Sequence, residues 1–265
     1  MTRFGKLELS DGSPQPRKRE QQDDDKPQKR YKTSVEDWML EADTHRRLGH
    51  YEEALRSYGR ALEAERSHVA AWLGQAQMLI LLDEARQAEM WTITGLKVFP
   101  GNAELLAARA QAICRLGNTR EAIQYSDAAI QGDGASAYRW MVRGELMAAS
   151  RSNNADHCFS SAEQLAPDWL VRTEIANVLR YYHNPLKGLT HAAAAIEIEN
   201  NAPFAWLVKG ICQFEAGFNS NAKESFQQAI NLSPSFIEAR EWLTKTENDV
   251  RIFKRILRWF WREKK

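Results

Sequence analysis

Residues 49–62 read GHYEEALRSYGRAL, and residues 217–230 follow the same plan as GFNSNAKESFQQAI. Each stretch opens with glycine, has alanine at its sixth position and carries an aromatic residue at its tenth, Tyr58 or Phe226. Small or apolar residues at i, i+3 or i+4 and i+7 follow the period of an α-helix. Glycine stands where one helix must stop and the chain must turn. The two stretches therefore predict a helix that follows a turn, in an arrangement that recurs.

The same spacing returns between these two stretches with a period of about 34 residues. Tryptophans, small residues four places after them and prolines at the ends of repeats mark it. The markers are Trp38, Trp72, Trp140 and Trp206, then Ala42, Ala76, Gly144 and Gly210, then Pro100, Pro167 and Pro234. No single pair of such helices can bury its apolar face alone, so neighbouring pairs must stack to form a continuous core. The sequence thus predicts an all-α repeat protein.

This pattern resembles the tetratricopeptide repeat family over residues 35–250. The resemblance implies a right-handed α-solenoid of six helix-turn-helix units, at 35–68, 69–102, 103–136, 137–168, 169–202 and 203–236, so that the array spans 35–236. The third unit has leucine where tryptophan is usual, and the fifth has Gly188 where alanine is expected. The related Sel1-like variant fits less well, because its units are longer and richer in glycine. A further helix at 237–250 would cap the last unit, as terminal repeats require.

The resemblance also implies a binding surface, because the first helices of such arrays line a concave face that holds a peptide or a partner helix. Residues one turn apart on these helices are the candidates for this groove. They are Leu73, Gln77, Ile80, Gln111, Arg115, Tyr138, Met141, Asn177, Arg180, Tyr181, Phe204, Leu207, Ile211 and Phe214. The first unit adds charged residues, among them Arg46 and Arg47. Fold alone does not give function, so the lining has to indicate the partner.

Two features of this lining bear on the partner. The first unit carries Met39 and Asp43 where chaperone-tail binders of this family carry basic or amide side chains, which disfavours such a partner. The sixth unit places four apolar residues of the groove set at helical spacing within 204–214. A patch of this kind is larger than a monomer normally leaves bare. Either the C-terminal helix covers it, or an amphipathic partner segment does.

The charge of the chain changes from its ends to its middle. Residues 1–34 carry a net charge of +3 and residues 251–265 carry +6, which leaves −8 for residues 35–250 in a chain of +1 overall. An acidic body argues against nucleic acid as a partner. The leader at 1–34 is polar, charged and rich in turn-forming residues, so we expect it to be disordered. Within it, RFGKLEL at 3–9 could serve as a short docking motif.

No motif in the sequence points to catalysis, a cofactor or a metal. There is no glycine-rich phosphate loop, HExxH, CxxC or GxSxG. Cys114, Cys158 and Cys212 are far apart in sequence, as expected of free thiols in a reducing compartment. The start lacks the apolar core of a signal peptide, and no stretch approaches the roughly 18 apolar residues that span a bilayer. We therefore expect a cytoplasmic protein that is not an enzyme and holds neither cofactor nor metal.

The last residues, RIFKRILRWFWREKK at 251–265, are basic and amphipathic. On a helical wheel the large apolar side chains share one face and most basic side chains share the other. The residues concerned are Arg251, Phe253, Lys254, Arg255, Leu257, Arg258, Trp259, Phe260, Trp261 and Arg262. Such a tail suits the surface of an anionic membrane. The alternatives are a helix that extends the cap or folds back on the array, and a tail that binds an acidic protein surface or nucleic acid.

Together these features predict a cytoplasmic scaffold or adaptor that binds a partner peptide or helix in its concave groove. In this interpretation the tail makes it a peripheral membrane protein. The alternative is a soluble assembly or chaperone-like adaptor whose tail forms a homo-oligomer with a second copy or occupies its own groove. The sequence does not identify the partner.

Overall fold

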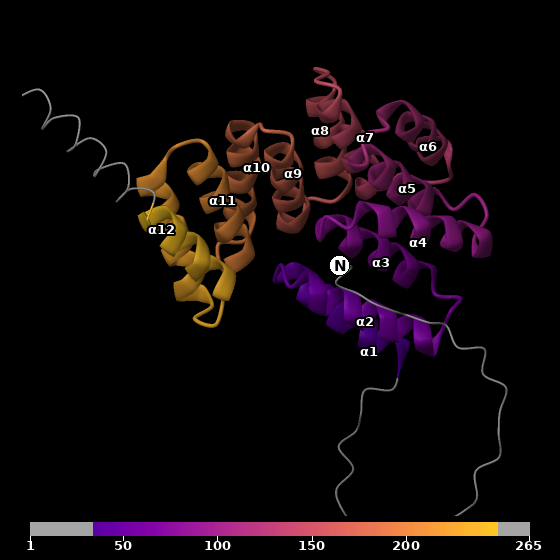
Figure 1. Ribbon diagram of the computed structural model, residues 1–265, viewed down its shortest axis with the longest axis horizontal. Helices are drawn as coiled ribbons and strands as arrows, with labels where there is room; N and C mark the ends of the chain where they lie inside the picture. Colours follow the sequence, from indigo (N-terminus) through magenta and orange to yellow (C-terminus); the bar gives the residue numbers. More distant parts are fainter. Residues whose placement is uncertain (1–33, 249–265) are drawn as a thin grey trace, which may run out of the picture. The chain divides into compact units, whose positions relative to one another are not determined.

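The structure is a computed structural model of the full chain, and it describes residues 34–248. Within that range every regular element is an α-helix, which confirms the all-α prediction. Figure 1 shows successive helices running side by side. The helices are α1 (Val35–Arg47), α2 (Tyr51–Ala64), α3 (Val69–Leu81), α4 (Ala85–Val98), α5 (Ala103–Arg115), α6 (Thr119–Gln131), α7 (Ala137–Ala149), α8 (Ala155–Leu165), α9 (Trp169–Tyr181), α10 (Pro185–Ile198), α11 (Pro203–Glu215) and α12 (Asn219–Leu232). A further helix covers 237–248.

The turn inside each helix pair has one backbone geometry throughout the described residues. One residue per turn adopts a positive φ, and the amide that follows it donates a hydrogen bond to a carbonyl five residues back, as at His50 to His45 (2.9 Å) and at Phe218 to Gln213 (2.8 Å). This bond satisfies a carbonyl at the end of the first helix. The positive-φ residues are Gly49, Asp83, Gly117, Arg151, His183 and Gly217. Three glycine turns were predicted, and the other three repeats form the same turn with a larger residue.

In two helix pairs, α7–α8 and α11–α12, an aromatic ring of the second helix meets a glycine of the first. A Cβ built at Gly144 would lie 2.4 Å from the Phe159 ring, and one built at Gly210 would lie 2.4 Å from the Phe226 ring. Only glycine therefore allows these helices to approach so closely. Phe159 and Phe226 are fully buried.

Neighbouring pairs share their cores, as stacked repeats require. One cluster joins Ala110 of α5, Ala122 of α6 and Val142 of α7. The presence of glycine at position 188 in α10, where alanine was expected, has a structural reason. A Cβ there would lie 2.9 Å from the carbonyl oxygen of Ala176 on α9. The weakest repeat of the sequence pattern is thus one in which two helices pack unusually close.

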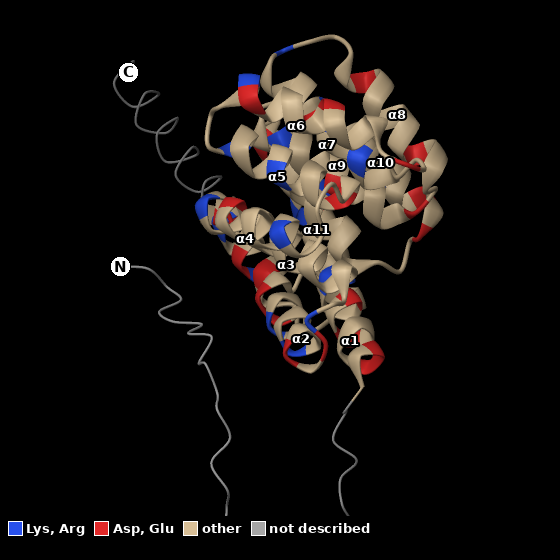
Figure 2. Cartoon of the chain, turned by 90° about the vertical axis from the view of Figure 1, so that its right-hand side faces the viewer, with Lys and Arg blue, Asp and Glu red and all other residues tan. Residues whose placement is uncertain are grey.

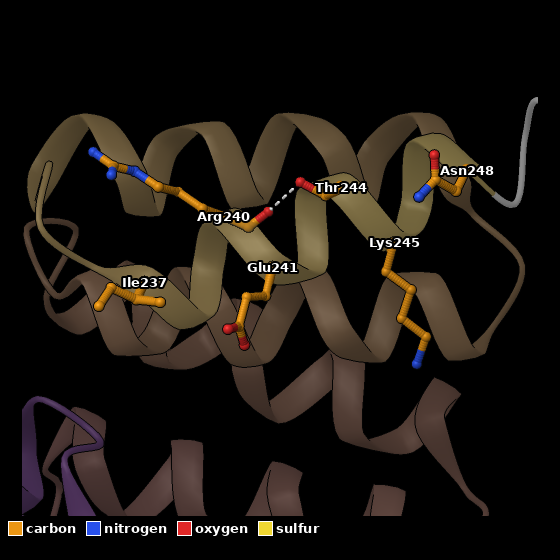
Figure 3. A pocket seen from close by; sticks show the side chains of 6 residues that line it. All are labelled: Ile237, Arg240, Glu241, Thr244, Lys245 and Asn248. Atoms are coloured by element: carbon orange, nitrogen blue, oxygen red, sulfur yellow. Dashed lines mark hydrogen bonds between the residues drawn. The ribbon is translucent and has the colours of Figure 1, made fainter.

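The helix at 237–248 covers the end of the α11–α12 pair. Trp242 lies against Phe214 (ring centroids 5.6 Å apart) and stacks on Phe226 (6.2 Å). Its opposite face borders a shallow hollow of about 520 Å³ (Figure 3). The residues that line this hollow are Ile237, Arg240, Glu241, Thr244, Lys245 and Asn248. Arg240, Glu241, Lys245 and Asn248 are charged or polar, and Thr244 adds a hydroxyl. This face is therefore suited to solvent rather than to another apolar helix.

Candidate functional site

A polar cluster lies on the inner face formed by α5, α7 and α9. Its centre is Glu145, which is fully buried. Glu145 accepts hydrogen bonds from Gln111 Nε2 (2.6 Å), Arg115 Nε (2.5 Å) and the Tyr182 hydroxyl (3.2 Å). The Tyr138 hydroxyl donates to Gln111 Oε1 (2.7 Å). We call Gln111, Arg115, Tyr138, Glu145 and Tyr182 the inner cluster.

The electrostatics of the inner cluster keep Arg115 charged and the two phenols neutral. Burial alone would lower the pKa of Arg115, but the Glu145 carboxylate outweighs burial and raises it above its usual value. Burial and then Glu145 raise the pKa of Tyr182, and the same two causes raise the pKa of Tyr138. Both phenols therefore remain hydrogen-bond donors at neutral pH. The buried charge of Glu145 is paired and hydrogen-bonded, as a buried charge must be.

A second contact joins residues that are far apart in sequence. Arg46 at the end of α1 forms two hydrogen bonds to Glu174 of α9, each of 2.9 Å. Arg47 binds Asp168, the N-cap residue of α9, at 2.5 Å. Burial would lower the pKa of Arg46, yet Glu174 raises it overall, so Arg46 stays charged. The first repeat is thereby tied to the fifth.

Aromatic packing extends this contact to α11. The turn residue Gly49 lies so near Phe204 that a Cβ on it would be 2.5 Å from the ring. Tyr51 meets the same ring edge to face, with centroids 5.9 Å apart. We call this set the closure contact, and it consists of Arg46, Arg47, Gly49 and Tyr51 on one side and Asp168, Glu174 and Phe204 on the other.

The structure divides the predicted groove residues into two groups. Gln77, Ile80, Gln111, Met141, Phe204, Leu207 and Ile211 are buried. Leu73, Arg115, Tyr138, Asn177, Arg180, Tyr181 and Phe214 are partly or well exposed. The second group includes Tyr181, with 39% of its surface exposed, and Arg180, which pairs with Glu215 at 2.8 Å. That these residues bind a partner remains a prediction.

The apolar section of the sixth repeat is covered from two directions. Phe204, Leu207 and Ile211 belong to one core cluster, against which Tyr51 of the first repeat packs. Phe214, in contrast, packs on Trp242 of the helix at 237–248. Phe236 and Ala239 belong to the same cluster, so the C-terminal segment and the first repeat both cover this section.

Sequence reasoning did not single out Asp168 and Glu174 as site residues. Glu174 and Arg46 are 128 positions apart, and no local pattern pairs them. The one available signal was the presence of Arg46 and Arg47 on the lining face of the first helix, where their charge needs a partner. Acidic and basic residues are interspersed along the described helices (Figure 2), so a particular pair does not stand out by charge.

The described residues offer little for covalent or metal chemistry. Cys114, Cys158 and Cys212 are buried free thiols. Burial raises the pKa of all three, and that of Cys212 to about 12, so their thiolate forms are disfavoured at neutral pH. Within residues 34–248, His, Cys, Asp and Glu side chains do not gather in groups of three that could hold a metal ion.

Two sequence predictions fall on segments for which the structure gives no description. The leader for which we expected disorder, with its RFGKLEL motif, falls on residues 1–33, and the predicted amphipathic tail falls on residues 249–265. Among the residues that are described, no helix has both the length and the apolar character that crossing a bilayer would need.

Comparison with known proteins bears on the family and the fold. Residues 39–91 match the family model of the tetratricopeptide repeat. A search of curated protein sequences found no match. Among solved structures, the chain is similar to a tetratricopeptide repeat protein from Parabacteroides merdae, with a TM-score of 0.51, 18% identity, and coverage of 80% of this chain and 84% of that one.

Two further structures are similar over a smaller share of their own length. One is a monomeric mutant of IFIT1 with Gppp-AAAA (TM-score 0.51, 17% identity, 70% of this chain and 47% of that one). The other is the APC/C hetero-tetramer Cut9–Hcn1 (TM-score 0.49, 15% identity, 82% of this chain). The chain spans only 44% of the matched chain in that assembly. Likeness at this identity concerns the fold alone. Residues 39–91 thus match the tetratricopeptide repeat, and helix pairs with one recurring turn give the described residues the fold of tetratricopeptide repeat proteins.

Proposed function

We propose that the protein is a non-enzymatic scaffold that binds a peptide or helix of a partner protein on its inner face. Tetratricopeptide repeat proteins generally serve as protein-interaction scaffolds. The observation that carries the proposal is the concentration of aromatic and charged side chains on the first helices α5, α7 and α9, where the inner cluster lies. Other packed faces of the described helices are mainly apolar.

The accessible part of this surface favours a particular partner chemistry. The exposed Tyr181 ring lies over the Arg115 guanidinium (3.9 Å to the ring centroid), whose side chain is only 7% exposed, and Lys245 lies 5.3 Å from the centroid of Phe214. Arg180 forms an ion pair with Glu215 (2.8 Å), and the two side chains are 27% and 30% exposed. Arginine and aromatic residues dominate the binding energy of many interfaces. The partner segment we propose therefore carries an apolar anchor next to carboxylates.

The test compares variants of the full-length chain in affinity capture followed by mass spectrometry. Tyr181→Ala and Arg180→Ala change the exposed part of the inner face, whereas Leu186→Ala changes an exposed residue of α10. Loss of an interface residue of this type should weaken capture by about tenfold or more. A partner retained by both inner-face variants, or lost equally with Leu186→Ala, would contradict the proposal.

The predicted role of the tail at 251–265 is a separate part of this proposal. Its net charge of +6 supports attachment to an anionic membrane. Full-length protein should float with anionic vesicles, and a chain ending at residue 250 should not. For the alternative, an assembly adaptor, light scattering should instead show a concentration-dependent mass that the same truncation removes.

A further inference from the structure

We propose that the closure contact is autoinhibitory: the first repeat covers the apolar section of the sixth repeat, and the contact must open before a partner can bind there. This inference rests on the proposed function, since it concerns access to the same inner face. It starts from Phe204, which is only 3% exposed and has Gly49 and Tyr51 on its ring. A partner with an apolar anchor would use the surface that Tyr51 now occupies.

The closure contact differs from the contacts between successive repeats in how it is made. Successive helix pairs share clusters of buried apolar side chains. The closure contact adds two ion pairs to the packing of Tyr51 on Phe204. The Arg46–Glu174 side chains are 19% and 5% exposed, and the Arg47–Asp168 side chains are 38% and 34% exposed. It joins helices that are not neighbours in the chain, so its opening leaves the apolar clusters between successive repeats in place. An exposed ion pair is a weak link compared with a shared core.

The aromatic part of the closure contact carries a cost that favours opening. The Tyr51 hydroxyl is buried, and it has no hydrogen-bond partner in the described structure. A buried hydroxyl left unpaired loses the hydrogen bond that it would make with water. Opening returns this hydroxyl to solvent while the hairpins stay folded. The contact thus combines a favourable ion pair with an unfavourable buried group, as expected of an element with two accessible states.

The turn of the first repeat is specialised for this contact. Gly49, Gly117 and Gly217 occupy the same place in their repeats and share a positive φ. A Cβ at Gly117 or Gly217 would meet nothing within 4 Å, whereas one at Gly49 would strike Phe204. The close approach at Gly49 therefore does not follow from the turn itself. It reflects the contact between distant repeats.

Hydroxyl-radical footprinting of the full-length chain tests whether the contact opens. Arg46→Glu and Glu174→Arg each place like charges opposite one another, and the double variant restores a pair of opposite charges. Because a minor open state is typically populated at about 0.1–10%, each single variant should raise the oxidation rate of Phe204 by about tenfold. The double variant should return it towards the wild-type rate. Phe226, fully buried within its own hairpin, is the internal control and should not change.

The outcomes separate this inference from the proposed function. An unchanged Phe204 rate in the single variants would overturn the inference, and so would a rise matched by Phe226, since the first repeat would then leave only when the array unfolds. The single variants should also capture more of the partner that Tyr181→Ala loses. If that partner is found and its capture does not rise, autoinhibition is wrong and the proposed function stands. If capture is insensitive to Tyr181→Ala, the proposed function fails, while footprinting still reports on opening.

Discussion

The interface between successive repeats and the closure contact both hold helix pairs together, but they use different kinds of interaction. Successive repeats meet through buried rings and small residues, as where the Tyr58 ring of α2 lies against Gly74 of α3. The closure contact meets through the Arg46–Glu174 pair and one aromatic edge. The first kind of interface is set by residues close in sequence, and the second joins residues 128 positions apart. The difference shows that the repeat pattern specifies the stack and leaves its closure to individual side chains.

The inner cluster is intermediate between these two kinds of contact. Like a core, it is buried around Glu145, and like the closure contact it is held by charge and hydrogen bonds. Replacing a buried ion pair by apolar residues is often neutral, whereas removing one partner is costly. The inner cluster therefore contributes more to the arrangement of α5, α7 and α9 than to the net free energy of folding.

The largest expected effect breaks an interface between successive helices. Phe226→Ala should lower the free energy of unfolding by about 3–5 kcal/mol, because it leaves a cavity beside Gly210 and Trp242. Urea unfolding followed by circular dichroism measures the change. Phe218→Ala, at a residue that is 46% exposed, is the matched control and should cost less than about 1 kcal/mol. Equal losses would show that the sixth repeat is not packed as described.

The next effect comes from the inner cluster. Glu145→Ala should destabilise the chain by about 3 kcal/mol, because Arg115 would remain buried without its carboxylate. Removing both groups, in Glu145→Ala with Arg115→Ala, should cost less than the sum of the two single changes. Thermal or urea unfolding of the three variants gives the comparison. A strictly additive result would mean that the two side chains do not depend on one another.

Much of the fold could be predicted from the sequence, because the stack is encoded by local and periodic signals. Tryptophans, small residues and glycine turns recur at fixed spacing, and the positive-φ turns at Gly49, Gly117 and Gly217 follow from residue type. Arg151 adopts the same turn without such a signal, because its position in the hairpin, and not its side chain, imposes it.

The site was less predictable than the fold. Helical spacing places Gln111, Tyr138 and Phe204 on the first helices, but it cannot show which lining residues are covered. Burial of Phe204 depends on how far the stack turns before the first repeat meets the sixth. The total rotation of the stack is the sum of small rotations at each repeat interface. No motif in a single repeat records it, so the closure contact became visible only in the structure.

A smaller effect compares two glycines that share a turn geometry. Gly49→Ala and Gly217→Ala both force alanine into a positive φ, at a cost of about 1 kcal/mol each. Gly49→Ala should cost about 1–2 kcal/mol more, because its Cβ also displaces Phe204. Parallel urea titrations of the two variants measure the difference. Indistinguishable midpoints would count against the packing of Gly49 on α11.

The smallest effect concerns the exposed half of the closure contact. Hydrogen bonds from Arg47 and from the Leu170 amide outweigh burial and hold the pKa of Asp168 below its usual value. A carboxylate with a lowered pKa stabilises the folded state at neutral pH, and this contribution disappears as the pH falls below about 4. Asp168→Asn can keep the N-cap hydrogen bond while removing the charge. It should cost about 0.5 kcal/mol at pH 7, reduced by solvent screening, and nothing at acidic pH.

Thermal melting of wild type and Asp168→Asn from pH 3 to pH 7 checks this dependence. The midpoints should differ at neutral pH and converge on acidification. Lys187, which pairs with Asp156 at an exposed position outside the closure contact, offers a control in Lys187→Gln. A constant offset between wild type and Asp168→Asn across the whole range would show that the carboxylate charge plays no part.

The most direct test of the account is a double-mutant cycle between Arg46 and Glu174. Arg46→Gln, Glu174→Gln and the double variant are compared by urea unfolding of the full-length chain. The two side chains share two hydrogen bonds across the closure contact. The two single losses of unfolding free energy should therefore add up to about 1–3 kcal/mol more than the loss in the double variant. Losses that add to within about 0.3–0.5 kcal/mol would mean that the first and fifth repeats do not touch in solution, which would contradict the account.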